Sequence, residues 1–369
     1  MANIKKVKRI AVIGSGHGGL TTAADLLNRG FEVKVYTMPK NFHKYRKMLP
    51  GNSVVVQEKD SSFVVNGIDI LCNPEEVIKD ADVVLFTLPG IALKRYAREV
   101  APFITSDQMI LFNLSACFAS ILFLNAIKDM NIETNFFFAE ANSLPYATRA
   151  YPDRGLIELS LRVKRLYITS YPKGRGDEAY EIANQLYPIY QKAEDVLHAF
   201  LLNANPEVHP APSVLNTGRI DYSKGDFYLY REGITKHTLK LMRKVAEERR
   251  TLARAYGYEL EGEKESRFNS GYFAYEPDKS LQELFNTSPV FRDIQGPTSV
   301  ESRYFQEDIS IGLVLWERLA KVAGLEVPNI SALITIGGTL ADADYRKSNF
   351  LEDFGFDSKN GIVGIQKNL

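Results

Sequence analysis

The chain has 369 residues, and its 45 lysines and arginines are balanced by 45 aspartates and glutamates, so the formal net charge at pH 7 is zero. A neutral chain has no overall electrostatic attraction to nucleic acid or to an anionic membrane. The length favours two domains of roughly 150 to 200 residues each. We therefore expect small-molecule partners, with no nucleic acid and no membrane among them.

The first predicted elements surround the segment AVIGSGHGGL, residues 11–20, whose glycines have G-x-G-x-x-G spacing. Residues 8–14 are predicted to form a buried strand and residues 18–28 a helix. In that context the motif is typical of a dinucleotide-binding turn, in which the helix N-terminus stabilises the phosphates; a bare turn is the alternative. The cofactor contacts predicted here are Gly14, Ser15, Gly16, His17, Gly18 and Gly19.

The second predicted strand, residues 31–37, ends without the acidic residue that usually binds the ribose 2′-hydroxyl. Tyr36 and Thr37 stand in its place, and Thr37 is predicted to contact the cofactor. Four basic residues follow: Lys40, Lys44, Arg46 and Lys47. Cations suit the 2′-phosphate of NADP, and a solvated basic loop is the alternative. We expect NAD or NADP as cofactor, with a lean to NADP.

Strands and helices then alternate to about residue 190. Residues 53–57 and 62–67 are predicted to form a short hairpin or an irregular insert. Further strands are predicted at residues 81–89, 108–115, 134–141 and 165–172, and helices at about 91–100, 119–129 and 176–191. Continuous apolar strands of this kind indicate a doubly wound parallel sheet. Residues 1–190 are therefore predicted to form a Rossmann-like dinucleotide-binding domain.

The two cysteines and the N-terminal segment indicate the cellular compartment of the protein. Cys72 and Cys117 lie in apolar, strand-like runs, which favours buried reduced thiols over a disulfide. The apolar run at the N-terminus stops at the glycines and is too short for a signal peptide or a membrane span. These features predict a cytoplasmic protein.

Past residue 190 the apolar residues recur at helical spacing. Helices are predicted within residues 196–204, 233–257 and 305–324. Their apolar stripes are interpreted as core, and the charges of RKVAEERR, residues 243–250, as a solvated face. The predicted fold class is therefore α/β: an N-terminal Rossmann-like parallel-sheet domain, then a mostly α-helical substrate-binding and catalytic domain over residues 191–369.

Two segments of this second half carry candidate chemistry. In NPEVHPAPSVLNTGR, residues 205–219, Pro206 can start a helix and place His209 and Asn216 on one face; a hydrogen-bonded core histidine is the alternative. Arg303 is followed by a loop-like YFQ and by Glu307 and Asp308, where an apolar helix begins. An arginine can bind a substrate carboxylate and an acid can orient a catalytic imidazole, although these acids could be simple helix N-terminal charges.

The chain resembles the opine dehydrogenase family, the octopine and nopaline dehydrogenases, through most of its length. The matching segments are GSGHGG, ADVVLFTLPG, AEANSLPYATR, VHPAPSVLNTG, FYLYREGIT, RYFQEDISIGLVLWERLAKVAG and FLEDFGFD. The histidine and arginine segments are far more specific than the glycine motif. The chain departs from relatives at NLSACFAS, residues 113–120, where many carry a glycine-rich turn.

The resemblance implies a reductive condensation in which an α-keto acid such as pyruvate meets the amino group of an amino acid, and NAD(P)H reduces the imine. It implies that His209 is the catalytic acid/base and that Asp308 pairs with it. The implied substrate-binding residues are Arg303, Asn216, Glu140 and Ser143, and further cofactor contacts are Leu88 and Pro89. A homodimer is also consistent with the resemblance.

Two other functions stay open. A simple 2-keto acid or polyol-phosphate reductase, like ketopantoate reductase or glycerol-3-phosphate dehydrogenase, would carry a catalytic lysine where this chain has His209, and the nearest preceding lysine is Lys192. A non-catalytic NAD(P)-binding redox sensor would need no set of histidine, aspartate and arginine. No CxxC or HExxH spacing occurs, so no metal site is predicted.

Overall fold

The computed structural model describes residues 5–45, 51–113, 118–347, 358–367 and 369. The chain forms two compact units. The first comprises Met1–Leu88, Ala92–Ser115 and Leu122–Ala199, and the second comprises Pro89–Ile91, Ala116–Ile121 and Phe200–Leu369. The chain therefore passes between the units more than once. The helices α4 (Gly90–Val100), α5 (Ala119–Ile127) and α7 (Val196–Leu201) have residues in both. None of the described helices is long and apolar enough to cross a membrane.

The first unit is built on an eight-stranded sheet in the order β12-β11-β8-β7-β6-β1-β2-β5. From β5 to β8 all neighbours are parallel, whereas β11 runs antiparallel to β8 and parallel to β12. The strands are β1 (Arg9–Ile13), β2 (Glu32–Tyr36), β5 (Asp69–Leu71), β6 (Val83–Phe86), β7 (Met109–Phe112), β8 (Phe137–Ala141), β11 (Leu166–Tyr171) and β12 (Tyr190–Lys192). The predicted parallel-rich α/β domain is confirmed, with its last two strands reversed.

The central strands are apolar because both faces of the sheet are covered. Every residue of β6 and β7 is buried, as expected for a parallel sheet between two helical layers. The helices of this region are α1 (His17–Asn28), α2 (Pro39–Phe42), α3 (Pro74–Ile78), α4 (Gly90–Val100), α5 (Ala119–Ile127) and α6 (Gly176–Leu186), with short 3₁₀ turns η1 (His43–Tyr45), η2 (Ala101–Phe103) and η3 (Pro152–Arg154). The helix predicted to residue 191 stops earlier, because Pro188 cannot continue it and β12 follows.

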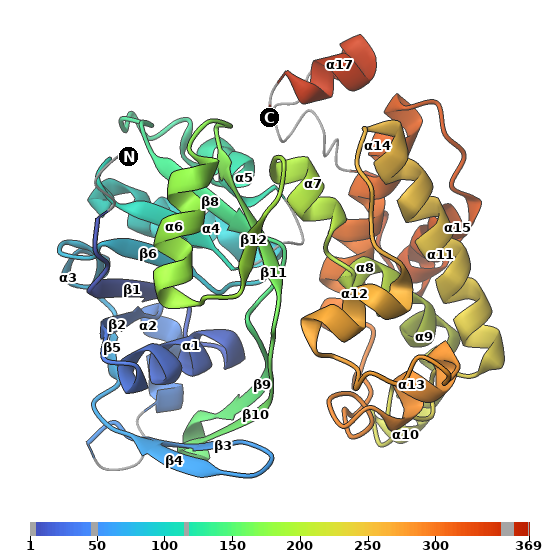
Figure 1. Ribbon diagram of the computed structural model, residues 1–369, viewed down its shortest axis with the longest axis horizontal. Coiled ribbons are helices and arrows are strands. Elements are labelled where there is room, and N and C mark those ends of the chain that lie inside the picture. The colour runs from blue at the N-terminus through green and yellow to red at the C-terminus, as the bar shows by residue number, and fades with distance from the viewer. Residues whose placement is uncertain (1–4, 46–50, 114–117, 348–357, 368) are drawn as a thin grey trace. The chain divides into compact units, whose positions relative to one another are not determined.

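A second sheet of four strands, in the order β4-β3-β10-β9, completes the first unit. Its strands are β3 (Val54–Gln57), β4 (Ser62–Val65), β9 (Tyr146–Tyr151) and β10 (Leu156–Arg162). Of the two alternatives for residues 53–57 and 62–67, the hairpin is the one observed, as β3 and β4. The strands β9 and β10 were not predicted. Helix α1 contacts both β2 and β9, so it lies between the two sheets (Figure 1). Buried Asp25 of α1 accepts a hydrogen bond from Tyr146 and pairs with Arg162, which fixes this contact.

The second unit consists of helices. After α7 (Val196–Leu201) they are α8 (Asn205–Val208), α9 (Pro210–Leu215), α10 (Thr217–Ser223), α11 (Lys236–Ala255), α12 (Glu263–Ser270), α13 (Leu281–Thr287), the π-helix η4 (Tyr304–Leu313), α14 (Val314–Val322), α15 (Pro328–Leu340), η5 (Ser358–Asn360) and α17 (Gly361–Gln366). The predicted apolar stripe of α11, including Leu239, Met242 and Val245, is buried. The mostly helical second half is thus confirmed.

Two helix predictions in this unit are wrong in detail. The segment from Pro206 to Asn216, predicted as one helix, is divided between α8 and α9, with His209 at their junction. The supposed loop YFQ, residues 304–306, is the first part of the π-helix, which continues directly into α14. The helix predicted within residues 305–324 thus begins at Tyr304, and its first 10 residues have π rather than α geometry.

The interpretation of residues 243–250 as a solvated face is wrong for Arg249, which is 4% exposed. Its guanidinium lies 2.8 Å from the carboxylate of Glu207, and Arg267 lies 2.9 Å from the other oxygen of that carboxylate. A buried charge is tolerated only when it is paired in this way. The three side chains therefore fasten α8, which ends one residue before His209, to α11 and α12.

The cysteines are only partly described. Cys72, directly after β5, is a free thiol as expected, but it is half-buried rather than buried. It follows the short edge strand of the sheet, where there is no further strand to cover it. Cys117 lies outside the described residues.

Candidate active site

The central feature of the second unit is a hydrogen bond between His209 and Asp308. Nδ1 of His209 lies 2.8 Å from Oδ2 of Asp308, although the residues are 99 positions apart. The two residues are 7% and 1% exposed. Because an ionised carboxylate only accepts, Nδ1 carries the proton and donates it. This tautomer leaves Nε2 of His209 as the ring atom that exchanges protons with a substrate.

Aromatic rings hold the imidazole from other directions. The ring of Tyr304 lies 4.6 Å from that of His209, and the ring of Tyr230 lies 6.4 Å away edge-on. Burial raises the pKa of Tyr230 well above its ordinary value, so this phenol stays neutral. Neither tyrosine was predicted from the sequence. Tyr230 lies in FYLYREGIT and Tyr304 in RYFQED, and the family resemblance of these two segments could have identified them.

Arg303 stands directly before the π-helix that carries Asp308. It is exposed, and no described acidic residue forms an ion pair with it. Partial desolvation lowers the pKa of Arg303, but the nearby carboxylates of Asp308 and Glu307 outweigh that effect and raise it, so the side chain stays charged. An exposed guanidinium within electrostatic range of Asp308 is suited to binding a carboxylate of a substrate.

Asn216 is the C-cap residue of α9, and its side chain forms local hydrogen bonds. Nδ2 donates to the backbone oxygen of Pro212 at 2.8 Å and to that of Gly233 at 3.2 Å. These bonds tie the end of α9 to the loop before α11. The side-chain nitrogen is therefore used by backbone acceptors, and the role of Asn216 in substrate binding stays a prediction.

The glycine turn of the first unit has the geometry of a dinucleotide cradle. Gly14 has φ +107°, a conformation that L side chains rarely adopt, and a Cβ on Gly19 would lie 1.8 Å from the Gly14 oxygen. Gly16 is different, because a Cβ there would meet nothing within 4 Å. The backbone conformation and packing of the turn thus require glycine at positions 14 and 19. At Gly16 the space is open, and in this motif the pyrophosphate of the dinucleotide approaches the middle glycine. The turn fits NAD(P).

The neighbours of this turn are held by hydrogen bonds. Ser15 donates to Thr37 at 2.7 Å, and the hydroxyl of Tyr45 donates to both the backbone and the side-chain oxygen of Ser15. The structure thus brings Ser15 and Thr37 together and adds Tyr45, which the sequence analysis missed. Lys40 and Lys44 are exposed nearby in sequence, whereas Arg46 and Lys47 lie outside the described residues.

Of the remaining predicted cofactor residues, Leu88 contacts the same turn. The side chain of Leu88 lies against Gly14, and that of Leu144 lies against Gly18. Nδ1 of His17 lies 3.0 Å from the backbone nitrogen of Ala150 in β9, so this ring helps to hold α1 against the second sheet. Pro89 is exposed. Their contacts with a cofactor stay predictions.

The other predicted substrate residues, Glu140 and Ser143, belong to the first unit. Glu140 is a buried residue of β8, paired in register with Phe112 of β7 and Thr169 of β11. Ser143 follows the strand and is half-buried. Their roles in substrate binding stay predictions. Within the second unit, His209 is hydrogen-bonded to Asp308, and Arg303 lies within electrostatic range of Asp308.

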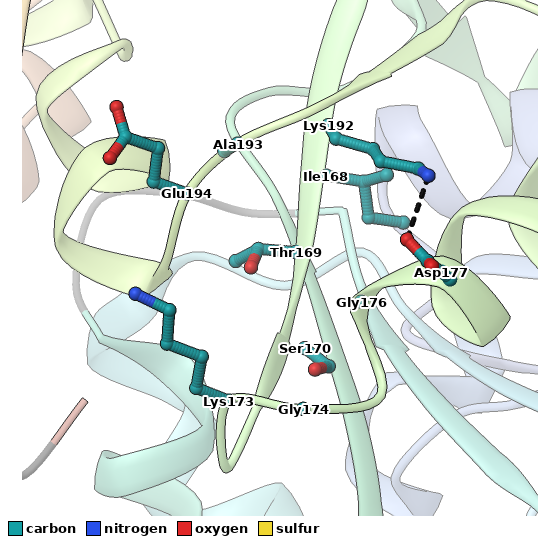
Figure 2. A pocket seen from close by; sticks show the side chains of 10 residues that line it. All are labelled: Ile168, Thr169, Ser170, Lys173, Gly174, Gly176, Asp177, Lys192, Ala193 and Glu194. Atoms are coloured by element: carbon teal, nitrogen blue, oxygen red, sulfur yellow. Dashed lines mark hydrogen bonds and ion pairs between the residues drawn. The ribbon is translucent and has the colours of Figure 1, made fainter.

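The first unit also has a separate cavity of about 250 Å³ (Figure 2). It is formed by β11, the start of α6 and the end of β12, and Lys192 on its wall pairs with Asp177 at 2.7 Å. Because β11 and β12 run against the other strands, their carboxyl ends lie at the edge opposite the glycine turn. The cavity contains none of the predicted site residues. Among the described residues, no group of three acidic, histidine or cysteine side chains could hold a metal ion.

Comparison with known proteins places these features in context. Residues 192–341 match the family model described as NAD/NADP octopine/nopaline dehydrogenase, alpha-helical domain. An opine dehydrogenase from Arthrobacter sp. (strain 1C) is 28% identical over 344 residues, which are 92% of each chain. The chain also resembles a solved octopine dehydrogenase with NADH and L-arginine, with a TM-score of 0.74, 20% identity and coverage of 97% and 98% of the two chains.

The fold is shared more widely. A ketopantoate reductase from Ralstonia eutropha JMP134 matches with a TM-score of 0.59 and 18% identity, covering 90% of this chain and 98% of the reductase. Similarity at this level of identity concerns the fold alone. Function must therefore be argued from the site residues.

Proposed function

Because the chain belongs to the opine dehydrogenase family, we propose that it joins an α-keto acid to the amino group of an amino acid and reduces the product. The amine and the ketone first condense to an imine with loss of water. The imine then takes up a hydride on carbon and a proton on nitrogen, which gives a secondary amine that carries two carboxylates. The residue pair His209–Asp308 is the observation that supports this proposal best.

The side chains of the second unit supply the proton transfers and the anchoring. Loss of water requires a proton on the departing hydroxyl. In this tautomer Nε2 of His209 is unprotonated, so it first accepts a proton from the condensing amine and then donates that proton to the hydroxyl. Asp308 fixes the ring and stabilises its charged form during the transfer. Arg303 binds a carboxylate of the keto acid or the amino acid. NAD(P)H, when bound at the glycine turn, supplies the hydride.

For the cofactor we propose a preference for NADPH over NADH. Thr37 replaces the acid that would repel a 2′-phosphate, and its hydroxyl is within hydrogen-bond distance of Ser15. Lys40 and Lys44 follow on α2 and η1 and are exposed. Replacing both lysines by glutamate should lower kcat/KM for NADPH by tenfold or more and leave that for NADH within about threefold. An equal loss with both cofactors would contradict the preference.

The reaction itself is tested by a matrix of α-keto acids against amino acids, followed by oxidation of NADH or NADPH. Rapid oxidation is expected only when keto acid and amino acid are both present. Oxidation with a keto acid alone would favour a simple reductase, whose fold this chain shares. Cofactor binding without any turnover, unchanged in His209→Ala, would instead support a sensor.

A further inference from the structure

Glu307 is a buried acid that the reaction described above does not use. It lies next to Asp308 in the π-helix and is 7% exposed. Burial raises the pKa of Glu307, while the guanidinium of Arg303 opposes that rise. Such a carboxylate is costly unless it is hydrogen-bonded. Its partner is the backbone N–H of Gly90, which donates to Oε1 at 2.8 Å across 217 positions of sequence.

Gly90 is the first residue of α4, where the chain needs an acceptor from elsewhere. The first N–H groups of any helix have no partner within the helix. The first turn of α4 contains no acidic residue, and the preceding Pro89 has no side-chain acceptor. The carboxylate of Glu307 therefore supplies the acceptor that an N-cap side chain would provide. Its negative charge also interacts favourably with the positive, N-terminal end of the helix dipole.

The segment that Glu307 holds leads directly to the cofactor turn. Leu88 precedes Pro89 and Gly90 in the chain, and its side chain lies against Gly14. Gly14 in turn donates its N–H to Tyr36 at the end of β2. A shift of Gly90 would therefore be transmitted through Pro89 to a side chain that shapes the glycine turn. The same π-helix carries Glu307 and the partner of His209.

We propose that Glu307 is a positioning residue: by holding Gly90, it fixes the Leu88–Pro89 segment for binding of the nicotinamide cofactor at the glycine turn. This inference rests on the proposed function only in requiring a dinucleotide. Its role depends on an acceptor oxygen at the right distance. A glutamine at position 307 should preserve that role, and an alanine should abolish it.

The test measures the dissociation constants of NADH and NADPH by fluorescence titration of the full chain, without turnover. Glu307→Ala should raise the dissociation constant for the preferred cofactor roughly tenfold or more, because the hydrogen bond that holds Gly90 is lost. Glu307→Gln should restore it to within about threefold of the parent, since the amide oxygen can still accept. Glu301→Ala, an exposed acid ahead of the same helix, should leave it unchanged.

Equal cofactor affinity in the parent and in Glu307→Ala would overturn the proposal. So would an equal loss in Glu307→Gln and Glu307→Ala, because the charge rather than the acceptor would then matter. If Glu307→Ala does not fold, Glu307→Asp replaces it, since its shorter side chain withdraws the acceptor and should weaken binding similarly. Failure of the condensation assay leaves these binding constants interpretable, so the two proposals fail separately.

Discussion

At the scale of single residues, the chemistry depends on which nitrogen of His209 faces the substrate. A histidine in water exchanges between two tautomers, and either nitrogen can carry the proton. Oδ2 of Asp308, 2.8 Å from Nδ1, selects one of them in a buried environment. The same contact prepares the ring to hold a positive charge after it accepts a proton.

Asp308→Asn should therefore impair turnover far more than binding. An amide can offer its NH₂ group to Nδ1, which favours the wrong tautomer and removes the stabilising charge. We expect kcat to fall by about 10²- to 10⁴-fold, with the dissociation constant of the cofactor unchanged. Steady-state kinetics and cofactor titration measure the two effects. Asp221→Asn, in an exposed acid of α10, should behave like the parent; turnover that survives in Asp308→Asn would argue against the proton-transfer role.

At the scale of elements, the π-helix and α8 are packed so closely that position 312 of the π-helix has no room for a side chain. A Cβ on Gly312 would lie 2.5 Å from Cγ of Pro206. Pro206 belongs to the short helix that ends just before His209, and Gly312 follows Asp308 by one turn of the π-helix. The distance between these two helices thus sets the distance between His209 and Asp308.

Gly312→Ala should push these elements apart. Overpacking of this kind costs about 1–3 kcal/mol of unfolding free energy, and we expect kcat to fall as the His209–Asp308 bond lengthens. Chemical denaturation and steady-state kinetics provide the measurements. Gly218→Ala is the matched control, because its Cβ would meet nothing within 4 Å in α10. Full activity in Gly312→Ala would show that the pair tolerates movement of its supporting helices.

At the scale of the whole molecule, the helical unit buries a charge cluster in its interior. The carboxylate of Glu207 bridges Arg249 and Arg267, and all three side chains are almost fully buried. Burial raises the pKa of Glu207, but the two guanidiniums outweigh that effect and hold it below its ordinary value. The cluster makes the stability of the fold dependent on ionisation of one acid.

Glu207→Gln should lower the unfolding free energy by about 3–5 kcal/mol at neutral pH, because two buried cations lose their counter-charge. A depressed pKa in the folded state gives stability that is present above the unfolded value, about 4.3, and is lost as pH falls through the folded value. The difference in unfolding free energy between the parent and Glu207→Gln should therefore become smaller below about pH 4. Urea denaturation across a pH series measures it; a difference independent of pH would contradict the assignment.

The sequence by itself determined the local features of this protein. The G-x-G-x-x-G turn, the apolar strands β6 and β7 and the stripe of α11 follow from patterns within a few residues, since backbone conformation and burial on one face leave a periodic trace. His209, Asp308 and Arg303 were also identified from their segments and their family resemblance. Each of these signals lies within one short stretch of chain.

Only the tertiary structure decided which distant groups meet. The His209–Asp308 bond, the Glu307–Gly90 bond and the ion pairs of Arg249 each join segments far apart in sequence. A hydrogen bond or ion pair depends on distances of a few ångströms, and no sequence periodicity encodes such a distance between separate elements. For the same reason, a charged residue such as Arg249 could be assigned to a solvated face until its partner was located.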